Sequence, residues 1–177
     1  MKNYQYSKII ISMVLMVFIG CDNASESEKN DNSQPILITT GNVNNGDIFI
    51  NLDSGSTDTT GDNWHISIIK DTANYNMPSI VFGMANIAVY NDTSYNEISN
   101  MPADFDSMLV LDNQTFEYGG ENEILSYDMD VHKVSVTNPD YIYILNFDDG
   151  IQEVFKLKFI EYQSGYTVLQ YNSLSNN

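Results

Sequence analysis

The sequence predicts an all-β fold: a single domain of antiparallel sheets that ends in a β-meander. Three observations predict it. The chain contains 12 Tyr and 8 Phe, residue types that favour strands. Short apolar stretches, several of them with period two, alternate with turns rich in Gly, Asn and Asp. No stretch of the chain combines a helical repeat with convincing helix caps.

The first twenty residues have the pattern of an export signal. Lys2 and Lys8 flank its start, and the apolar run over residues 9–19 is too short for a membrane-spanning helix, which needs about 20 residues. Gly20 directly precedes Cys21, the only cysteine of the chain, as in the lipobox of bacterial lipoproteins. Residues 1–20 are therefore predicted to be a lipoprotein signal peptide, with Cys21 as the lipidation site. The alternative is an ordinary signal peptide followed by a chance cysteine.

The segment after the lipidation site predicts a spacer followed by one domain. Residues 21–35 contain no large apolar side chain and predict a flexible acidic tether, because they cannot bury enough surface to order themselves. Residues 36–177 have a length that suits one domain. With the only cysteine assigned to the lipid, this domain has no intramolecular disulfide and depends on core burial.

Charge excludes one class of partner. Removal of the signal leaves five lysines and no arginine against 24 acidic residues, a formal net charge of −19. Nucleic acids bind through clusters of basic residues, so we expect no nucleic-acid partner. A protein with this charge is repelled by anionic head groups, and stable anchoring at Cys21 predicts more than one acyl chain.

The first half of the domain predicts five strands, over residues 36–40, 47–52, 64–68, 79–82 and 85–90. Between the second and the third lies a long polar turn over residues 53–63. In the third strand, period-two alternation places Trp64, Ile66 and Ile68 on one face. His65 has the opposite phase, and we expect it to face the surface or a sheet edge.

The middle of the domain, residues 91–123, predicts irregular structure with one strand at 107–111. The C-terminal third predicts strands over residues 132–136, 141–147, 154–162 and 166–171. A tight turn at residues 148–150 joins the second of these to the third. In the third strand Phe155, Leu157 and Phe159 share one face, and Lys156 and Lys158 share the other.

Motifs of catalysis are missing from the sequence. It contains no Gly-x-Ser-x-Gly elbow, phosphate-binding loop or His-Glu-x-x-His pattern, and its only histidines are His65 and His132. Acidic residues in the turns are the type that binds calcium, but none follows the twelve-residue calcium-loop pattern, so solvated turns are the preferred interpretation. We therefore predict that the protein is not an enzyme and holds no metal ion of its own.

Methionines are the most distinctive candidates for ligand binding. A thioether sulfur is a soft donor that can serve as an axial ligand of haem iron. Met101, Met108 and Met129 lie in or beside the irregular section, where loops could form a pocket. Met77 and Met84 are expected to fill the core instead.

Several segments in a fixed order resemble the HmuY-like family of haem-binding lipoproteins. The first part of the resemblance comprises residues 49–55 and 64–68, where His65 replaces the Asp that is typical of the family. The second part comprises the following segments: residues 132–134, 141–144, 149–150, 156–159, 161–162 and 165–171.

The resemblance implies an all-β fold, anchorage at the outer membrane, and capture of haem for transfer to a TonB-dependent outer-membrane transporter. It implies two axial ligands, each His or Met. Met129 falls near the second ligand position and Met101 or Met108 near the first, whereas His132 matches a recurrent strand residue of the family rather than its usual ligand. The substitution at His65 and the absence of Arg favour the alternative, a non-haem surface β-domain that binds another ligand or a partner protein.

Overall fold

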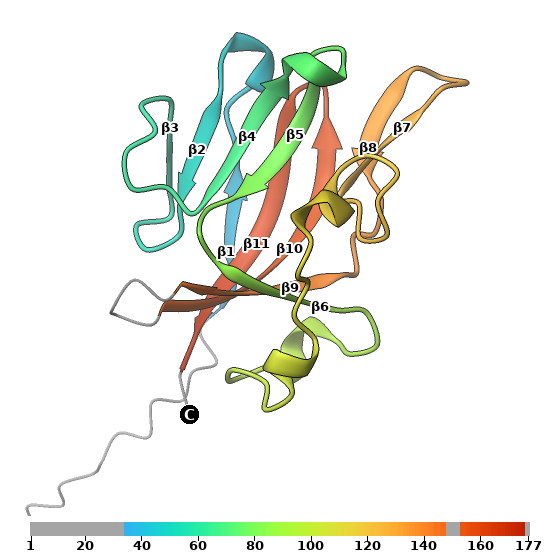
Figure 1. Ribbon diagram of the computed structural model, residues 1–177. Coiled ribbons are helices and arrows are strands. Elements are labelled where there is room, and N and C mark those ends of the chain that lie inside the picture. Colours follow the sequence, from blue (N-terminus) through green and yellow to red (C-terminus); the bar gives the residue numbers. More distant parts are fainter. Residues whose placement is uncertain (1–33, 148–152, 176–177) are drawn as a thin grey trace, which may run out of the picture.

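The computed structural model describes residues 34–147 and 153–175 and confirms the all-β fold (Figure 1). The named strands pair antiparallel, and the helices of the described residues are short 3-10 turns. None of these helices is long and apolar enough to cross a membrane. The predicted signal, Cys21, most of the tether and the turn at 148–150 lie outside the described residues.

The strands are β1 (Ile36–Thr39), β2 (Ile48–Asn51), β3 (Ser56–Asp58), β4 (Ile66–Asp71), β5 (Met77–Phe82), β6 (Asn86–Tyr90), β7 (Leu125–Asp128), β8 (Lys133–Val136), β9 (Ile142–Phe147), β10 (Glu153–Gln163) and β11 (Tyr166–Leu174). The 3-10 turns are η1 (Val43–Asn45), η2 (Thr72–Asn74), η3 (Tyr95–Glu97), η4 (Phe105–Ser107) and η5 (Asn113–Phe116).

Two larger sheets and one two-stranded sheet build the domain. The five-stranded sheet has the order β1-β11-β10-β9-β6, and the four-stranded sheet has the order β3-β2-β4-β5. The third sheet is the β7–β8 hairpin, which projects from the body beside β10 (Figure 1). The predicted meander is confirmed, since β9, β10 and β11 pair consecutively.

The main core lies between the two larger sheets. Ile50, Ile66 and Ile68 of the four-stranded sheet and Leu157 and Phe159 of the five-stranded sheet are fully buried in one cluster. The prediction that Phe155, Leu157 and Phe159 share one apolar face of β10 is therefore correct. Aromatic rings contribute much of the volume, and Phe159 contacts the rings of both Phe82 and Tyr143.

A second, smaller core covers the opposite face of β9 and β10. Tyr95 and Phe105 of η3 and η4 pack there with Ile142, Ile144 and other apolar residues. The face of β10 that carries Lys156 is therefore closed as well, and Lys156 is buried. Its ammonium group donates to the carbonyl oxygens of Tyr95 at 2.9 Å and Ile98 at 2.6 Å.

Several strand predictions need correction. Residues 107–111 do not form a strand: Ser107 ends the 3-10 turn η4, and Leu109 forms one isolated bridge with Ala88. The turn predicted over 53–63 contains the short strand β3, and β7 was not predicted at all. Polar and acidic residues dominate β3 and the exposed end of β7, so hydrophobic periodicity does not reveal them.

Burial of tyrosines predicts loss of stability in alkali. Burial raises the pKa of Tyr143, and it raises the pKa of Tyr95 as well. Above about pH 10 the unfolded chain loses these phenolic protons while the folded chain keeps them, so each group lowers the free energy of unfolding by about 1.4 kcal/mol per pH unit. The stabilisation that these two buried, protonated tyrosines provide is fully present below about pH 10 and is lost as the pH rises further.

Urea unfolding between about pH 9 and 11.5 measures this effect. Above about pH 10, the variant Tyr143→Phe is expected to have a slope shallower by about 1.4 kcal/mol per pH unit than the unmodified chain. Equal slopes for the two proteins would contradict the burial argument.

Candidate functional site

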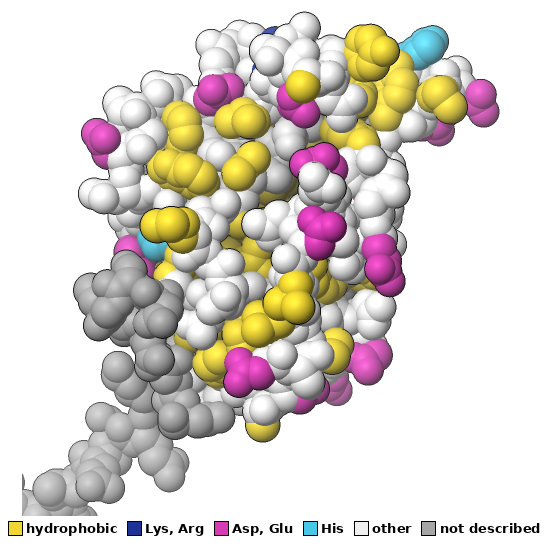
Figure 2. Space-filling view, viewed as in Figure 1, with side chains coloured by type: hydrophobic (Ala, Val, Ile, Leu, Met, Phe, Trp, Pro, Cys, Tyr) yellow, Lys and Arg dark blue, Asp and Glu magenta, His cyan; other side chains and the backbone are white. Residues whose placement is uncertain are grey.

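The β7–β8 hairpin carries a cluster of exposed apolar side chains together with a histidine. Tyr127, Met129, Val131 and His132 cluster at its end, and all are exposed, Met129 by 77%. Figure 2 shows hydrophobic, acidic and histidine side chains gathered on this projecting element. An apolar cluster on a projecting hairpin is typical of a binding surface.

Local hydrogen bonds order the turn of this hairpin. The Asp128 carboxylate accepts from the backbone N–H groups of Asp130 at 2.8 Å and Val131 at 3.3 Å. His132 closes the turn in the left-handed region, with φ +53°, and β8 begins one residue later. The expected strand start at His132 is therefore one residue too early, and the side chain belongs to the turn.

His132 has a polar partner that leaves its second nitrogen available. Its Nδ1 lies 2.7 Å from the hydroxyl oxygen of Tyr127. A hydroxyl can accept as well as donate, so Nδ1–H can donate to Tyr127 while Nε2 keeps its lone pair. A histidine that binds a metal through Nε2 has this arrangement, with the other nitrogen held by a hydrogen-bond acceptor.

An open groove lies beside the hairpin. Its volume is about 410 Å³, within the range of about 300–1,000 Å³ that is typical of ligand pockets. Val131, His132, Lys133 and Val134 form one wall, and Tyr162 with the β10–β11 turn forms the other. The groove therefore combines apolar contact area with a potential iron ligand and one cation.

The predicted haem-ligand methionines lie in different parts of the fold. Met129 is at the end of the β7–β8 hairpin, whereas Met108 directly follows η4 and is 37% exposed. Met101 is half-buried against the second core. Figure 1 places η4 and the end of the hairpin at opposite ends of the molecule, so the structure does not bring Met108 and Met129 together. Each of the three methionines therefore remains a prediction, as the only methionine ligand of a haem.

Met84 does not fill the core. It lies in the segment that joins β5 of the four-stranded sheet to β6 of the five-stranded sheet, and it is 99% exposed. The core assignment of Met84 is therefore wrong. Met77, at the start of β5, is half-buried.

The expectation of a surface-facing His65 is also wrong, because His65 is buried next to the main core. Its ring stacks edge-on against Phe147 and Phe155, with centroids 4.7 Å and 5.4 Å away. Its backbone N–H donates to Ile50, and its backbone oxygen accepts from Gly83. These contacts turn the residue inward before β4 begins, so the period-two phase of β4 does not extend to it.

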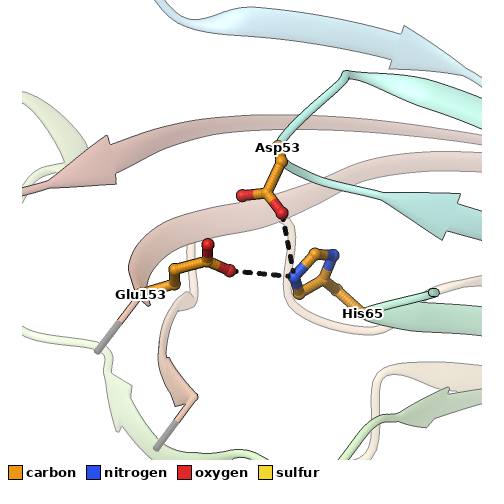
Figure 3. Close-up of side chains that lie close together, drawn as sticks. All are labelled: Asp53, His65 and Glu153. Carbon is orange, nitrogen blue, oxygen red and sulfur yellow. Dashed lines mark ion pairs between the residues drawn. The ribbon is translucent and has the colours of Figure 1, made fainter. Parts of the chain in front are cut away.

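His65 lies between two carboxylates (Figure 3). Its Nε2 is 3.4 Å from a carboxylate oxygen of Glu153 and 3.7 Å from one of Asp53. These three side chains, from three separate segments, are close enough together to hold a metal ion.

The hydrogen bonds of His65 do not fit a metal centre. Its Nδ1 accepts from the backbone N–H of Leu52 at 3.0 Å. The proton of the neutral ring is therefore on Nε2, the nitrogen that faces both carboxylates. Moving that proton to Nδ1 would place it against the N–H of Leu52, so Nε2 keeps the proton and has no lone pair for a metal ion.

No family model, no curated protein and no solved structure matches the chain.

Proposed function

We propose that this chain is a lipid-anchored protein of the bacterial envelope that binds haem, with the β7–β8 hairpin and its groove as the binding face. The observation that carries the proposal is the position of His132 and Met129. Two side chains able to ligate iron belong to one exposed turn, and one of them, His132, lines the open groove. The lipoprotein signal and the resemblance to HmuY-like proteins support the same function.

The residues of the groove fit one edge of a haem. Val131, Val134 and Tyr162 offer apolar contact to a flat macrocycle, and Lys133 offers a cation to a propionate. His132, held by Tyr127, is the stronger ligand candidate because imidazole suits iron well. Met129 lies three residues before it and offers a second, softer donor. Since both belong to one turn, the hairpin would serve one face of the haem.

Haem would be the cargo of this protein. Capture on an exposed hairpin leaves the haem accessible for transfer to a TonB-dependent transporter in the outer membrane, as the resemblance implies. The flexible tether predicted at residues 21–35 would let the domain reach such a partner from its lipid anchor.

A second candidate function rests on the same exposed cluster. Tyr127, Met129 and Val131 are side chains of the kind that protein partners bury. Under this alternative the hairpin docks onto a partner protein without haem. Co-purification from detergent extracts distinguishes the two, since only the alternative requires a stable complex in haem-free membranes.

Titration of the purified protein with haemin tests the proposal. At micromolar protein we expect a shifted Soret band that saturates at one haem per chain, because an imidazole or thioether ligand changes the iron coordination. Serum albumin and free haemin serve as spectral references. A spectrum equal to that of free haemin throughout the titration would exclude haem binding.

A further inference from the structure

A second cavity lies on the other side of the domain from the haem-binding face proposed above. Its volume is about 390 Å³, and it opens beside β1, the start of β10 and the end of β11. Leu52, Phe155 and Leu174 line it with apolar surface. Asp53 and Glu153 line it with carboxylates. The cavity therefore pairs an apolar interior with a local negative charge.

Among the described residues, no lysine neutralises the two carboxylates. The group between Asp53 and Glu153 is His65. Nδ1 of His65 accepts from the backbone N–H of Leu52, so the ring faces the two carboxylates with its Nε2–H. The side chain of Asp53 is 49% exposed and that of Glu153 is 24% exposed, so a ligand can reach both.

Tyr171 adds a polar group to the same cavity. The residue is 1% exposed, and its hydroxyl has no hydrogen-bond partner among the described residues. Burial raises the pKa of Tyr171, and the nearby charge of Asp53 raises it further. A buried hydroxyl without a partner costs about 1–3 kcal/mol, so its presence in a cavity wall points to a group that completes it.

We propose that this cavity binds a small organic ammonium cation, with Asp53 and Glu153 accepting from the ammonium group and the apolar lining receiving its hydrocarbon part. Carboxylates are the strong acceptors for N⁺–H donors, and the paired negative charge selects a cation. The unpartnered Tyr171 hydroxyl provides a further acceptor. The proposal does not depend on haem binding, because the two sites share no residue.

A metal ion fits this cavity less well. The proton on Nε2 of His65 excludes the third ligand, which leaves two carboxylates beside an apolar wall. Hard divalent cations prefer six or more oxygen ligands. An alkylammonium ion needs fewer acceptors and gains from the apolar lining.

Titration of the full chain in detergent with n-butylammonium chloride tests the proposal, followed by the NMR amide shifts of Leu52 and Phe155 at constant ionic strength. We expect saturable shifts in the unmodified protein and none with n-butanol, the neutral analogue of similar shape. Asp53→Asn and Glu153→Gln should each weaken binding at least tenfold. Asp106→Asn, which removes an equal charge from the exposed turn η4, should leave affinity unchanged.

Three outcomes would overturn the proposal. Equal shifts with butanol would show that the cavity binds hydrocarbon alone. Equal weakening by Asp106→Asn would show that butylammonium responds only to the net charge. Displacement of butylammonium by equimolar calcium or zinc would identify a metal site instead. If Glu153→Gln does not fold, Asp53→Asn decides alone, because the side chain of Asp53 is half-exposed and does not pack in the core.

Discussion

Replacing Phe159 with alanine is expected to lower the free energy of unfolding by about 3–5 kcal/mol. The ring is fully buried at the centre of the main core, where it contacts the rings of Phe82 and Tyr143. Truncation removes its transfer free energy and leaves a cavity between two sheets that cannot close around it. A domain of this size has a total stability of about 5–15 kcal/mol, so the loss is a large part of it.

Urea unfolding followed by circular dichroism measures the change. Tyr166→Ala is the matched control, because Tyr166 lies on the neighbouring strand β11 and is 45% exposed. We expect its effect to stay below about 1 kcal/mol. Similar losses for the two variants would contradict the assignment of Phe159 to the centre of the core.

Replacing Lys156 with methionine is expected to cost about 3 kcal/mol, because the carbonyl oxygens of Tyr95 and Ile98 lose a charged donor and stay buried. Methionine keeps most of the apolar volume of the side chain, so the change reports the ammonium group. That group also lies 4.3 Å from the centroid of the Tyr95 ring, a cation–π contact that methionine cannot make. The second core should loosen around η3.

Lys158→Met provides the control for Lys156→Met. Lys158 lies two residues along the same strand and is only half-buried, and we expect a change within about 0.5 kcal/mol. Hydrogen exchange should show faster exchange of the η3 amides in Lys156→Met alone. A Lys156→Met protein as stable as the unmodified chain would mean that the ammonium group does not stabilise the second core.

Periodicity and turn residues predict most of this fold. The strands β2, β4, β9, β10 and β11 each carry apolar residues on the face that packs in the main core, and a period of two reveals such strands. The segment over residues 91–123 has no such pattern. Its apolar residues Tyr95 and Phe105 lie on 3-10 turns and fill the second core, a role that depends on long-range contacts with β9 and β10.

The two candidate sites differ in how far the sequence reveals them. Met129 was a candidate from its type and position, and its exposure on a hairpin end follows from the Asp128 turn. His65 was expected at the surface, because strand phase alone places it opposite Ile66. Its burial depends on Phe147 and Phe155, which reach it from the other sheet, and no local pattern encodes that contact. Asp53 and Glu153 are 100 residues apart in sequence and meet only in the folded chain.

Haem binding by the β7–β8 hairpin is tested most directly by comparing haemin affinity and the Soret band in three variants, His132→Ala, Met129→Ala and Met108→Ala. If the hairpin is the binding face, His132→Ala should weaken affinity at least tenfold and change the Soret maximum. Met129→Ala should have a smaller effect, and Met108→Ala, at the other end of the fold, should match the unmodified protein. Loss of binding in Met108→Ala with His132→Ala unchanged would contradict the proposed site, and no Soret shift in any of the proteins would contradict haem binding itself.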